Sequence, residues 1–273
     1  MILDPLVYVR ADSTDDAVAC LDKHGDGAKV IAGGHSLVPL MKLGLVVPEV
    51  LIDISRVSSL DFIEERADRL VIGAGVTHAA LASSRAVRDA CPMLSYAASL
   101  VGDPAVRHRG TIGGSIAHGD PAGDLPTVAL ALDAELVVVG PGGRRLVLAS
   151  DFFLGFWETA LAPNEILSEV RFPRRTYKWA YEKFARRSFD WAIVGIAVVG
   201  APDSGVQIAL SNMSSRPVRA IESENALRRG ASVPEAALLV SAGLDPPSDV
   251  NASTEFRRHL AEVLCRRMVG RVC

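Results

Sequence analysis

The sequence predicts an α+β protein with a larger N-terminal domain and a smaller C-terminal domain. A chain of 273 residues, 49% of them hydrophobic, is long enough for two domains and can bury a sizeable core. Short apolar runs typical of strands alternate with segments of helical periodicity, without internal repeats or low-complexity linkers. The pattern changes near residue 177, where two strands are followed by three helical segments. The predicted domains are therefore residues 1–176 and 177–273.

The first part of the chain alternates strands with helices. Ser13 precedes Asp15, Asp16 and an apolar stripe, the pattern of a capped amphipathic helix with acids at its positive end. Thr77 is expected to cap a further helix, and another helix is expected near Ala90–Val101. The strands expected here are Lys29–Ala32, Val50–Ile54 and Leu70–Ile72.

The rest of the first domain is expected to contain an apolar helix, a hairpin and a final strand. The helix covers Leu125–Leu132. The segment Gly-Pro-Gly-Gly at 140–143 separates Leu136–Val139 from Arg145–Leu148, as the turn of a β-hairpin does. The strand Ile166–Phe172 completes the domain.

The second domain is predicted to begin with strands at Ala192–Val199 and Val206–Leu210. Three helical segments follow, and the last of them covers Ser253–Val269. Its spacing predicts one packing face, made of Phe256, Leu260, Val263 and Leu264.

Charge and composition exclude several classes of protein. A formal net charge of -3 provides no basic surface for a polyanion, so nucleic acid is not an expected partner. The segment Met1–Pro5 lacks the basic start and apolar core of a signal peptide. The longest apolar run, Ala192–Ala201, has about half of the roughly 20 residues that a membrane span needs. We therefore expect a soluble, cytoplasmic protein.

The cysteines exclude a metal or cluster site built on thiolates. No C-x-x-C pair occurs, so the chain has no framework for a zinc site or an iron–sulfur cluster. Any redox cofactor must therefore be held by other groups. The four cysteines are Cys20, Cys91, Cys265 and Cys273.

Two segments about 80 residues apart share a double glycine that is followed closely by a serine. They are "AGGHSLVP" at 32–39 and "TIGGSIAHGDPAGDLP" at 111–126. Glycine can take positive φ and lets a ligand approach the main chain, so successive N–H groups can converge on an anion. Two such turns could hold a diphosphate from both sides, with serine and threonine hydroxyls as further donors. The alternative is that each pair is only a tight turn between strands.

Neither segment matches a common nucleotide-binding fingerprint. The G-x-G-x-x-G spacing of a Rossmann site and the Gly-Lys-Ser/Thr of a P-loop are both absent from them. A Rossmann dehydrogenase and a P-loop NTPase are therefore not indicated.

Together with "YEKFARRSFDWAIVGIAVV" near residue 190, these two segments resemble the FAD-binding medium subunit of molybdenum hydroxylases. That family includes carbon monoxide dehydrogenase and the xanthine dehydrogenases, and the resemblance covers nearly the whole chain. It implies a two-lobed FAD-binding domain of the vanillyl-alcohol oxidase type, whose lobes divide near residue 57. It also implies a smaller α+β C-terminal domain of the carbon monoxide dehydrogenase flavoprotein type.

The resemblance also implies the cofactor-binding residues. The first FAD loop would be formed by Ala32, Gly33, Gly34, His35 and Ser36, with Leu37 packed nearby. The second would be formed by Thr111, Gly113, Gly114 and Ser115.

Outside the loops, the resemblance gives Asp124 and Lys183 distinct roles. Asp124 would bind the adenosine ribose, and its alternative role is an N-cap of the following helix. Lys183 would lie near the flavin, where its charge stabilises the reduced, anionic form.

Three nearby residues are open between a functional and a structural role. His118 could tune the flavin or relay protons, or it could be a hydrogen-bonded structural histidine. Asp190 and Trp191 could approach the ring, or they could be a solvated acid and a core aromatic residue.

The function implied by the resemblance is electron transfer within a heteromeric enzyme. Noncovalently bound FAD would accept electrons from [2Fe-2S] clusters on a small subunit and pass them to an external acceptor. Hydroxylation would occur at a molybdopterin centre on a large subunit, on carbon monoxide, a purine, an N-heterocycle or an aldehyde. The alternative is a stand-alone FAD-dependent oxidase or dehydrogenase of the same wider fold, although only 5% of the residues are aromatic and the segment after residue 177 is short for a cap domain.

Overall fold

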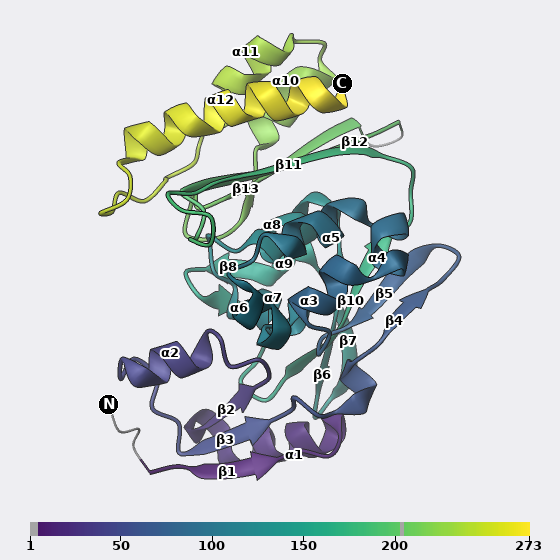
Figure 1. Ribbon diagram of the computed structural model, residues 1–273, viewed down its shortest axis with the longest axis vertical. Coiled ribbons are helices and arrows are strands. Elements are labelled where there is room, and N and C mark those ends of the chain that lie inside the picture. Colours follow the sequence, from purple (N-terminus) through teal and green to yellow (C-terminus); the bar gives the residue numbers. More distant parts are fainter. Residues whose placement is uncertain (1–4, 203–204) are drawn as a thin grey trace.

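A computed structural model describes residues 5–202 and 205–273 of the protein. Three sheets follow one another along the longest axis of the molecule, from the N-terminal end to the C-terminal end (Figure 1). Helices of the central part lie between the second and third sheets, and the long C-terminal helix covers the outer face of the third.

The first sheet is parallel and has three strands in the order β1-β3-β2. Helix α1 packs on it, and Ser13 caps that helix by accepting a hydrogen bond from the Asp16 N–H at 3.0 Å. Helix α2 follows directly after the first glycine loop. The bounds are β1 Val7–Arg10, α1 Thr14–His24, β2 Ala28–Ile31, α2 Leu37–Lys42 and β3 Val50–Asp53.

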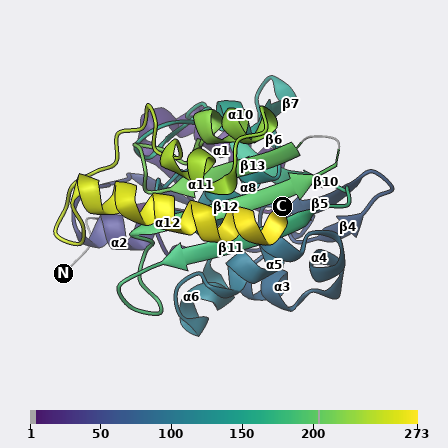
Figure 2. The same ribbon diagram turned by 90° about the horizontal axis from the view of Figure 1, so that it is seen from above.

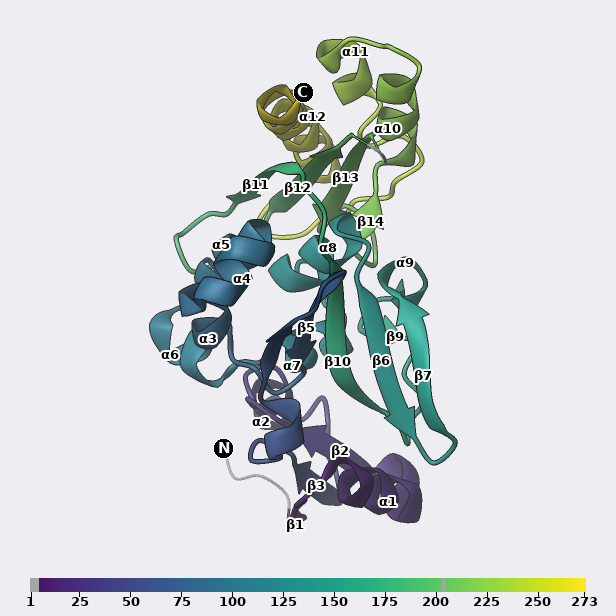
Figure 3. The same cartoon turned by 90° about the vertical axis from the view of Figure 1, so that its right-hand side faces the viewer.

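The second sheet is antiparallel, in the order β4-β5-β10-β6-β7. Gly140 pairs with Gly143, so the expected hairpin is confirmed as β6 and β7. Figure 3 shows helices α3 to α6 gathered to one side of this sheet. The strands are β4 Ile63–Glu65, β5 Arg69–Gly73, β6 Glu135–Gly140, β7 Gly143–Leu148 and β10 Ile166–Pro173.

The helices of the central part are short. Thr77 caps α3 by accepting a hydrogen bond from the Ala80 N–H at 3.2 Å, as the sequence predicts. The helices are α3 His78–Ser83, α4 Arg85–Ala90, α5 Pro92–Ser99, α6 Pro104–Arg109, α7 Ile112–His118, α8 Asp124–Ala131 and α9 Ala149–Phe152. A two-stranded ribbon, β8 Phe153–Gly155 and β9 Glu158–Thr159, follows α9.

The third sheet is antiparallel, in the order β11-β12-β13-β14, and both of its faces are covered. Helix α12 crosses its outer face (Figure 2), while α5 and α8 contact it from the inside. The elements are β11 Lys178–Phe184, β12 Val194–Ala201, β13 Gly205–Ser211, β14 Val218–Arg219, α10 Ile221–Arg228, α11 Val233–Leu238 and α12 Thr254–Val272.

The expected packing face of the last helix is only partly right. Leu260 and Leu264 are buried, whereas Phe256 is 43% exposed and Val263 is half-buried. The buried stripe contains Arg257, which is fully buried and forms an ion pair with Asp249 at 2.8 Å. The buried face is therefore rotated by about one residue, or roughly 100°, from the one that apolar spacing predicts.

No helix within residues 5–202 and 205–273 has the length and apolar character that a membrane crossing requires. The cytoplasmic location stays a prediction.

Candidate functional site

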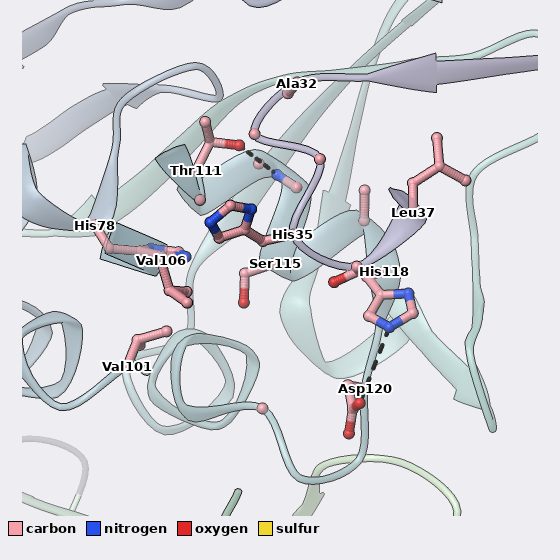
Figure 4. Close-up of a pocket in the computed structure, with 18 of the residues that line it drawn as sticks. Ala32, His35, Leu37, His78, Val101, Val106, Thr111, Ser115, His118 and Asp120 are labelled. Atoms are coloured by element: carbon pink, nitrogen blue, oxygen red, sulfur yellow. Dashed lines mark hydrogen bonds and ion pairs between the residues drawn. The ribbon is translucent and has the colours of Figure 1, made fainter. Parts of the chain in front are cut away.

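A cavity of about 560 Å³ lies where segments from all three parts of the molecule meet. Its walls come from the first glycine loop, helices α3, α6 and α7, strand β10 and the chain around β11. The structure brings all twelve predicted site residues to this one cavity, part of which is drawn in Figure 4. They are Ala32, Gly33, Gly34, His35, Ser36, Leu37, Thr111, Gly113, Gly114, Ser115, Asp124 and Lys183.

The first glycine loop leaves β2 in a conformation that requires glycine at two positions. Gly34 has a φ of +75°, in the left-handed region that favours glycine. A Cβ atom on Gly33 would stand 2.1 Å from the Arg109 carbonyl oxygen, so this segment and the end of α6 meet backbone to backbone. The N–H groups of residues 33–36 donate to no protein atom within the described part of the chain. They are therefore available to an anion in the cavity.

The second glycine pair is not the loop that the sequence suggests. Gly113 and Gly114 lie in the first turn of α7, and neither has positive φ. Their N–H groups are already used: Gly113 donates to Ala74 O at 2.9 Å and Gly114 to Thr111 Oγ1 at 3.0 Å. The expectation of a second backbone anion nest is therefore wrong.

The first turn of α7 instead lines the cavity with small residues. A Cβ atom on Gly113 would lie 2.4 Å from the Ala74 Cβ, so glycine is needed for close packing against the end of β5. Gly114 is exposed on the cavity wall, and the half-buried Ser115 offers a hydroxyl that bonds to no protein group in the described residues. Figure 4 shows the Thr111 hydroxyl engaged in its capping bond.

Asp124 is buried, and both of its carboxylate oxygens are bonded to residues of β11. The Tyr181 hydroxyl donates to Oδ1 at 2.5 Å, and Lys183 Nζ donates to Oδ2 at 2.8 Å. Lys183 Nζ also lies 3.2 Å from the Leu100 carbonyl oxygen. The N-cap of α8 is Gly123, so the alternative role of Asp124 as a cap is wrong. The carboxylate instead joins α8 to the third sheet at the cavity wall.

Burial and hydrogen bonding act in opposite directions on the pKa of the Asp124 carboxyl group. Burial raises the pKa of Asp124, while the ion pair with Lys183 and the bond from Tyr181 oppose that rise. Burial also raises the pKa of Tyr181 well above its ordinary value, so the phenol is a donor at every working pH. The ionised carboxylate thus depends on two neighbouring donors.

Three histidines line the cavity in different environments. His78, which belongs to no sequence motif, is 4% exposed, and burial lowers its pKa to about 4. Its Nδ1 has no hydrogen-bond partner within the described residues. Burial also lowers the pKa of His118, which lies 3.9 Å from Asp120 (Figure 4) and stacks on Trp157. His35 is exposed.

The segment after β11 also reaches the cavity. Trp191 lines it and is 61% exposed, so the alternative of a core aromatic residue is wrong. Asp190 is half-buried in the same wall. Apolar residues that carried no motif complete the walls; they include Val101, Val106, Leu161 and Ile166.

The class of protein follows from comparison with known families. A family described as the FAD binding domain in molybdopterin dehydrogenase matches residues 4–175. A second, the CO dehydrogenase flavoprotein C-terminal domain, matches residues 179–272. The chain belongs to this family of FAD-binding subunits, and the resemblance seen in the sequence is confirmed.

Individual relatives match along nearly their whole length. The carbon monoxide dehydrogenase medium chain of Hydrogenophaga pseudoflava is 40% identical, over 99% of this chain and 98% of the relative. The nicotine 6-hydroxylase medium subunit of Paenarthrobacter nicotinovorans is 39% identical, over 98% of each.

Solved structures agree with these relatives. Carbon monoxide dehydrogenase from Hydrogenophaga pseudoflava superposes with a TM-score of 0.96 at 40% identity, covering 100% of this chain and 98% of that one. Quinoline 2-oxidoreductase from Pseudomonas putida 86 gives 0.94 at 31% identity, with the same coverage.

Proposed function

We propose that this FAD subunit transfers electrons within a molybdenum hydroxylase, from iron–sulfur clusters on a partner subunit to an external acceptor. The carrying observation is that all twelve predicted cofactor residues, from segments up to about 150 positions apart, line a single cavity. Its volume of about 560 Å³ lies in the usual range of roughly 300–1,000 Å³ for cofactor and small-molecule sites.

The donor groups of the cavity suit a dinucleotide with a diphosphate. We assign the diphosphate to the free N–H groups of residues 33–36, with the Ser36 and Ser115 hydroxyls as further donors. Gly114 has no side chain to project from α7 into the cavity, so the ligand can pass close to this helix. FAD, when bound, supplies the capacity to accept two electrons and release them to another acceptor.

Asp124 and Lys183 complete the proposed site. Lys183 brings a positive charge to the wall, where it stabilises negative charge on a reduced cofactor. Each oxygen of Asp124 accepts one bond from a protein group and keeps a second lone pair, so the carboxylate can still accept a hydrogen bond from a hydroxyl group of the cofactor.

The names of the relatives indicate which partners to expect. Several are named as medium chains or subunits, and their names refer to carbon monoxide, nicotine, glyceraldehyde, caffeine and xanthine. We propose a large molybdopterin subunit and a small [2Fe-2S] subunit as partners, with FAD held noncovalently by residues 1–176 and closed over by residues 177–273. The hydroxylated substrate is set by the large subunit.

Reconstitution tests this proposal. The chain is produced with its large and small partners and separately alone, and the flavin absorbance of both samples is followed anaerobically after the hydroxylase substrate is added. We expect reduction in the complex and none in the isolated, FAD-loaded chain. Flavin reduction by an organic substrate in the isolated chain would overturn the proposal in favour of a stand-alone oxidase.

A further inference from the structure

A hydrogen-bonded network of three polar side chains is buried where α8 meets β11. Tyr181, Asp124 and Lys183 are linked by hydrogen bonds of 2.5 and 2.8 Å, and the side chains of Asp124 and Lys183 are 4% and 7% exposed. Tyr181 is itself 4% exposed and belongs to the main hydrophobic core. The Lys183 end of this network is also held by a hydrogen bond to the Leu100 carbonyl oxygen.

The unit is electrically neutral as long as the carboxylate is ionised. The charge of Asp124 is balanced by Lys183, and the Tyr181 hydroxyl supplies one further donor. Burial opposes the ionised form and raises the pKa of Asp124. The equilibrium between the ionised and protonated forms of Asp124 therefore responds to any new charge placed in the same low-dielectric space.

Asp124 and Lys183 both line the cavity, so a negative charge that appears there acts on both. It attracts the ammonium group of Lys183 and repels the carboxylate of Asp124. A proton on Asp124 removes the repulsion and leaves Lys183 as an unbalanced cation facing the new anion.

We propose that Asp124 takes up one proton when FAD in the cavity is reduced, so that the Asp124–Lys183 pair changes from neutral to cationic. This inference rests on the proposed function. The balance is FAD + 2 e⁻ + H⁺ → FADH⁻ at the cofactor and –COO⁻ + H⁺ → –COOH at Asp124, with both protons from solvent. The electrons come from the iron–sulfur partner, or from dithionite in the test below.

Other titratable groups face this unit and could take the proton instead. Asp120 lies on the segment before α8 and acts on Asp124 by charge repulsion, and His118 is 3.9 Å from Asp120. Tyr96 of α5 packs edge-on against Tyr181. His78 also lines the cavity, and its pKa of about 4 disfavours protonation. The test must therefore separate Asp124 from Asp120 and His118.

The test measures the midpoint potential of bound FAD against pH, in the complete chain, by anaerobic titration with dithionite and redox dyes. Each proton taken up with two electrons changes the equilibrium constant tenfold per pH unit, which is about 30 mV. We expect the wild-type slope to exceed that of Asp124→Asn by about 30 mV per pH unit, over the pH range in which Asp124 is ionised in the oxidised protein and protonated in the reduced one. The control variants Asp120→Asn and His118→Gln keep the wild-type slope.

Two further variants keep the outcome decisive. If Asp124→Asn fails to fold with Lys183 unpaired, the double variant Asp124→Asn/Lys183→Gln removes both charges and still lacks the extra slope. Tyr181→Phe removes a donor to the carboxylate, so the steep region moves to higher pH.

A wild-type slope in FAD-loaded Asp124→Asn, or its loss in His118→Gln or Asp120→Asn, overturns this proposal and leaves the proposed function intact. Wild-type protein that binds no FAD overturns the proposed function itself.

Discussion

The backbone carbonyl oxygen of Arg109 lies 2.1 Å from the point where a Cβ atom on Gly33 would stand. Real Cβ atoms essentially never come within 3.0 Å of a non-bonded heavy atom of another segment, so a side chain at this position forces the two segments apart. The glycine is therefore required by the contact between the first loop and the end of α6. That contact sets the position of the free N–H groups in the cavity wall.

Gly33→Ala is expected to reduce FAD binding strongly. The methyl group displaces the first loop from the end of α6 and moves the N–H groups of residues 33–36 from their positions in the cavity wall. We expect at least a tenfold loss of affinity, about 1.4 kcal/mol, measured by flavin titration of the FAD-free protein. Gly142→Ala is the matched control, because its Cβ would meet nothing within 4 Å. Full flavin occupancy in Gly33→Ala would show that this loop does not hold the diphosphate.

Gly114→Ala is expected to separate FAD binding from folding. Gly114 is helical, so alanine should gain about 0.5–1 kcal/mol from helix propensity. The new Cβ would lie 2.9 Å from Thr111 Oγ1 and weaken a cap of the kind that contributes about 0.5–2 kcal/mol. The free energy of unfolding of the FAD-free protein should therefore change by no more than about 1.5 kcal/mol, while the methyl group on the cavity wall lowers FAD affinity. An unchanged affinity would remove Gly114 from the proposed site.

The sequence predicts most of the strands and helices whose own residues carry a recognisable pattern. The strands at β2, β3, β5, β6, β10, β12 and β13 are confirmed, because apolar runs bounded by turn residues are typical of buried strands. The sequence pattern does not predict strand β11, because Lys178–Phe184 mixes lysine, glutamate and aromatic residues and has only two buried positions. The position of β11 in the sheet is decided by its pairing with β12, and the local sequence of β11 does not reveal that pairing.

The sequence predicts which residues form the site better than it predicts their geometry. The glycine pairs looked alike, but one is a loop with free N–H groups and the other is a helical turn that packs on Ala74. A double glycine is permissive for either state, so local sequence does not decide between them. Tyr181 and His78 carry no motif, and their roles depend on contacts with residues far along the chain.

His78 is expected to make folding stability depend on acid. Burial lowers its pKa from 6.5 to about 4, so between these values the unfolded state binds a proton that the folded state does not. Stability therefore falls as the pH falls from 6.5 towards 4, by about 3 kcal/mol from this group. Urea unfolding at several pH values should show that His78→Gln lacks this part of the slope.

The control for His78 is His259→Gln, which removes an exposed imidazole from α12. Its acid dependence should match that of the wild type. If His78→Gln keeps the full wild-type slope, the imidazole is not neutral and buried in solution.

Lys183→Met is expected to destabilise the protein more at pH 8 than at pH 5. Without the ammonium group, nothing but the Tyr181 bond opposes the effect of burial, which raises the pKa of Asp124 further. From the ordinary Asp value up to that raised pKa, the folded state binds a proton that the unfolded state lacks, so stability falls as the pH rises through this range. At neutral pH, breaking a buried pair costs about 3–5 kcal/mol. Thermal and denaturant unfolding at both pH values measure the difference, and the double variant Asp124→Asn/Lys183→Met should lose it. Equal destabilisation at pH 5 and pH 8 would contradict the buried ion pair between these two residues.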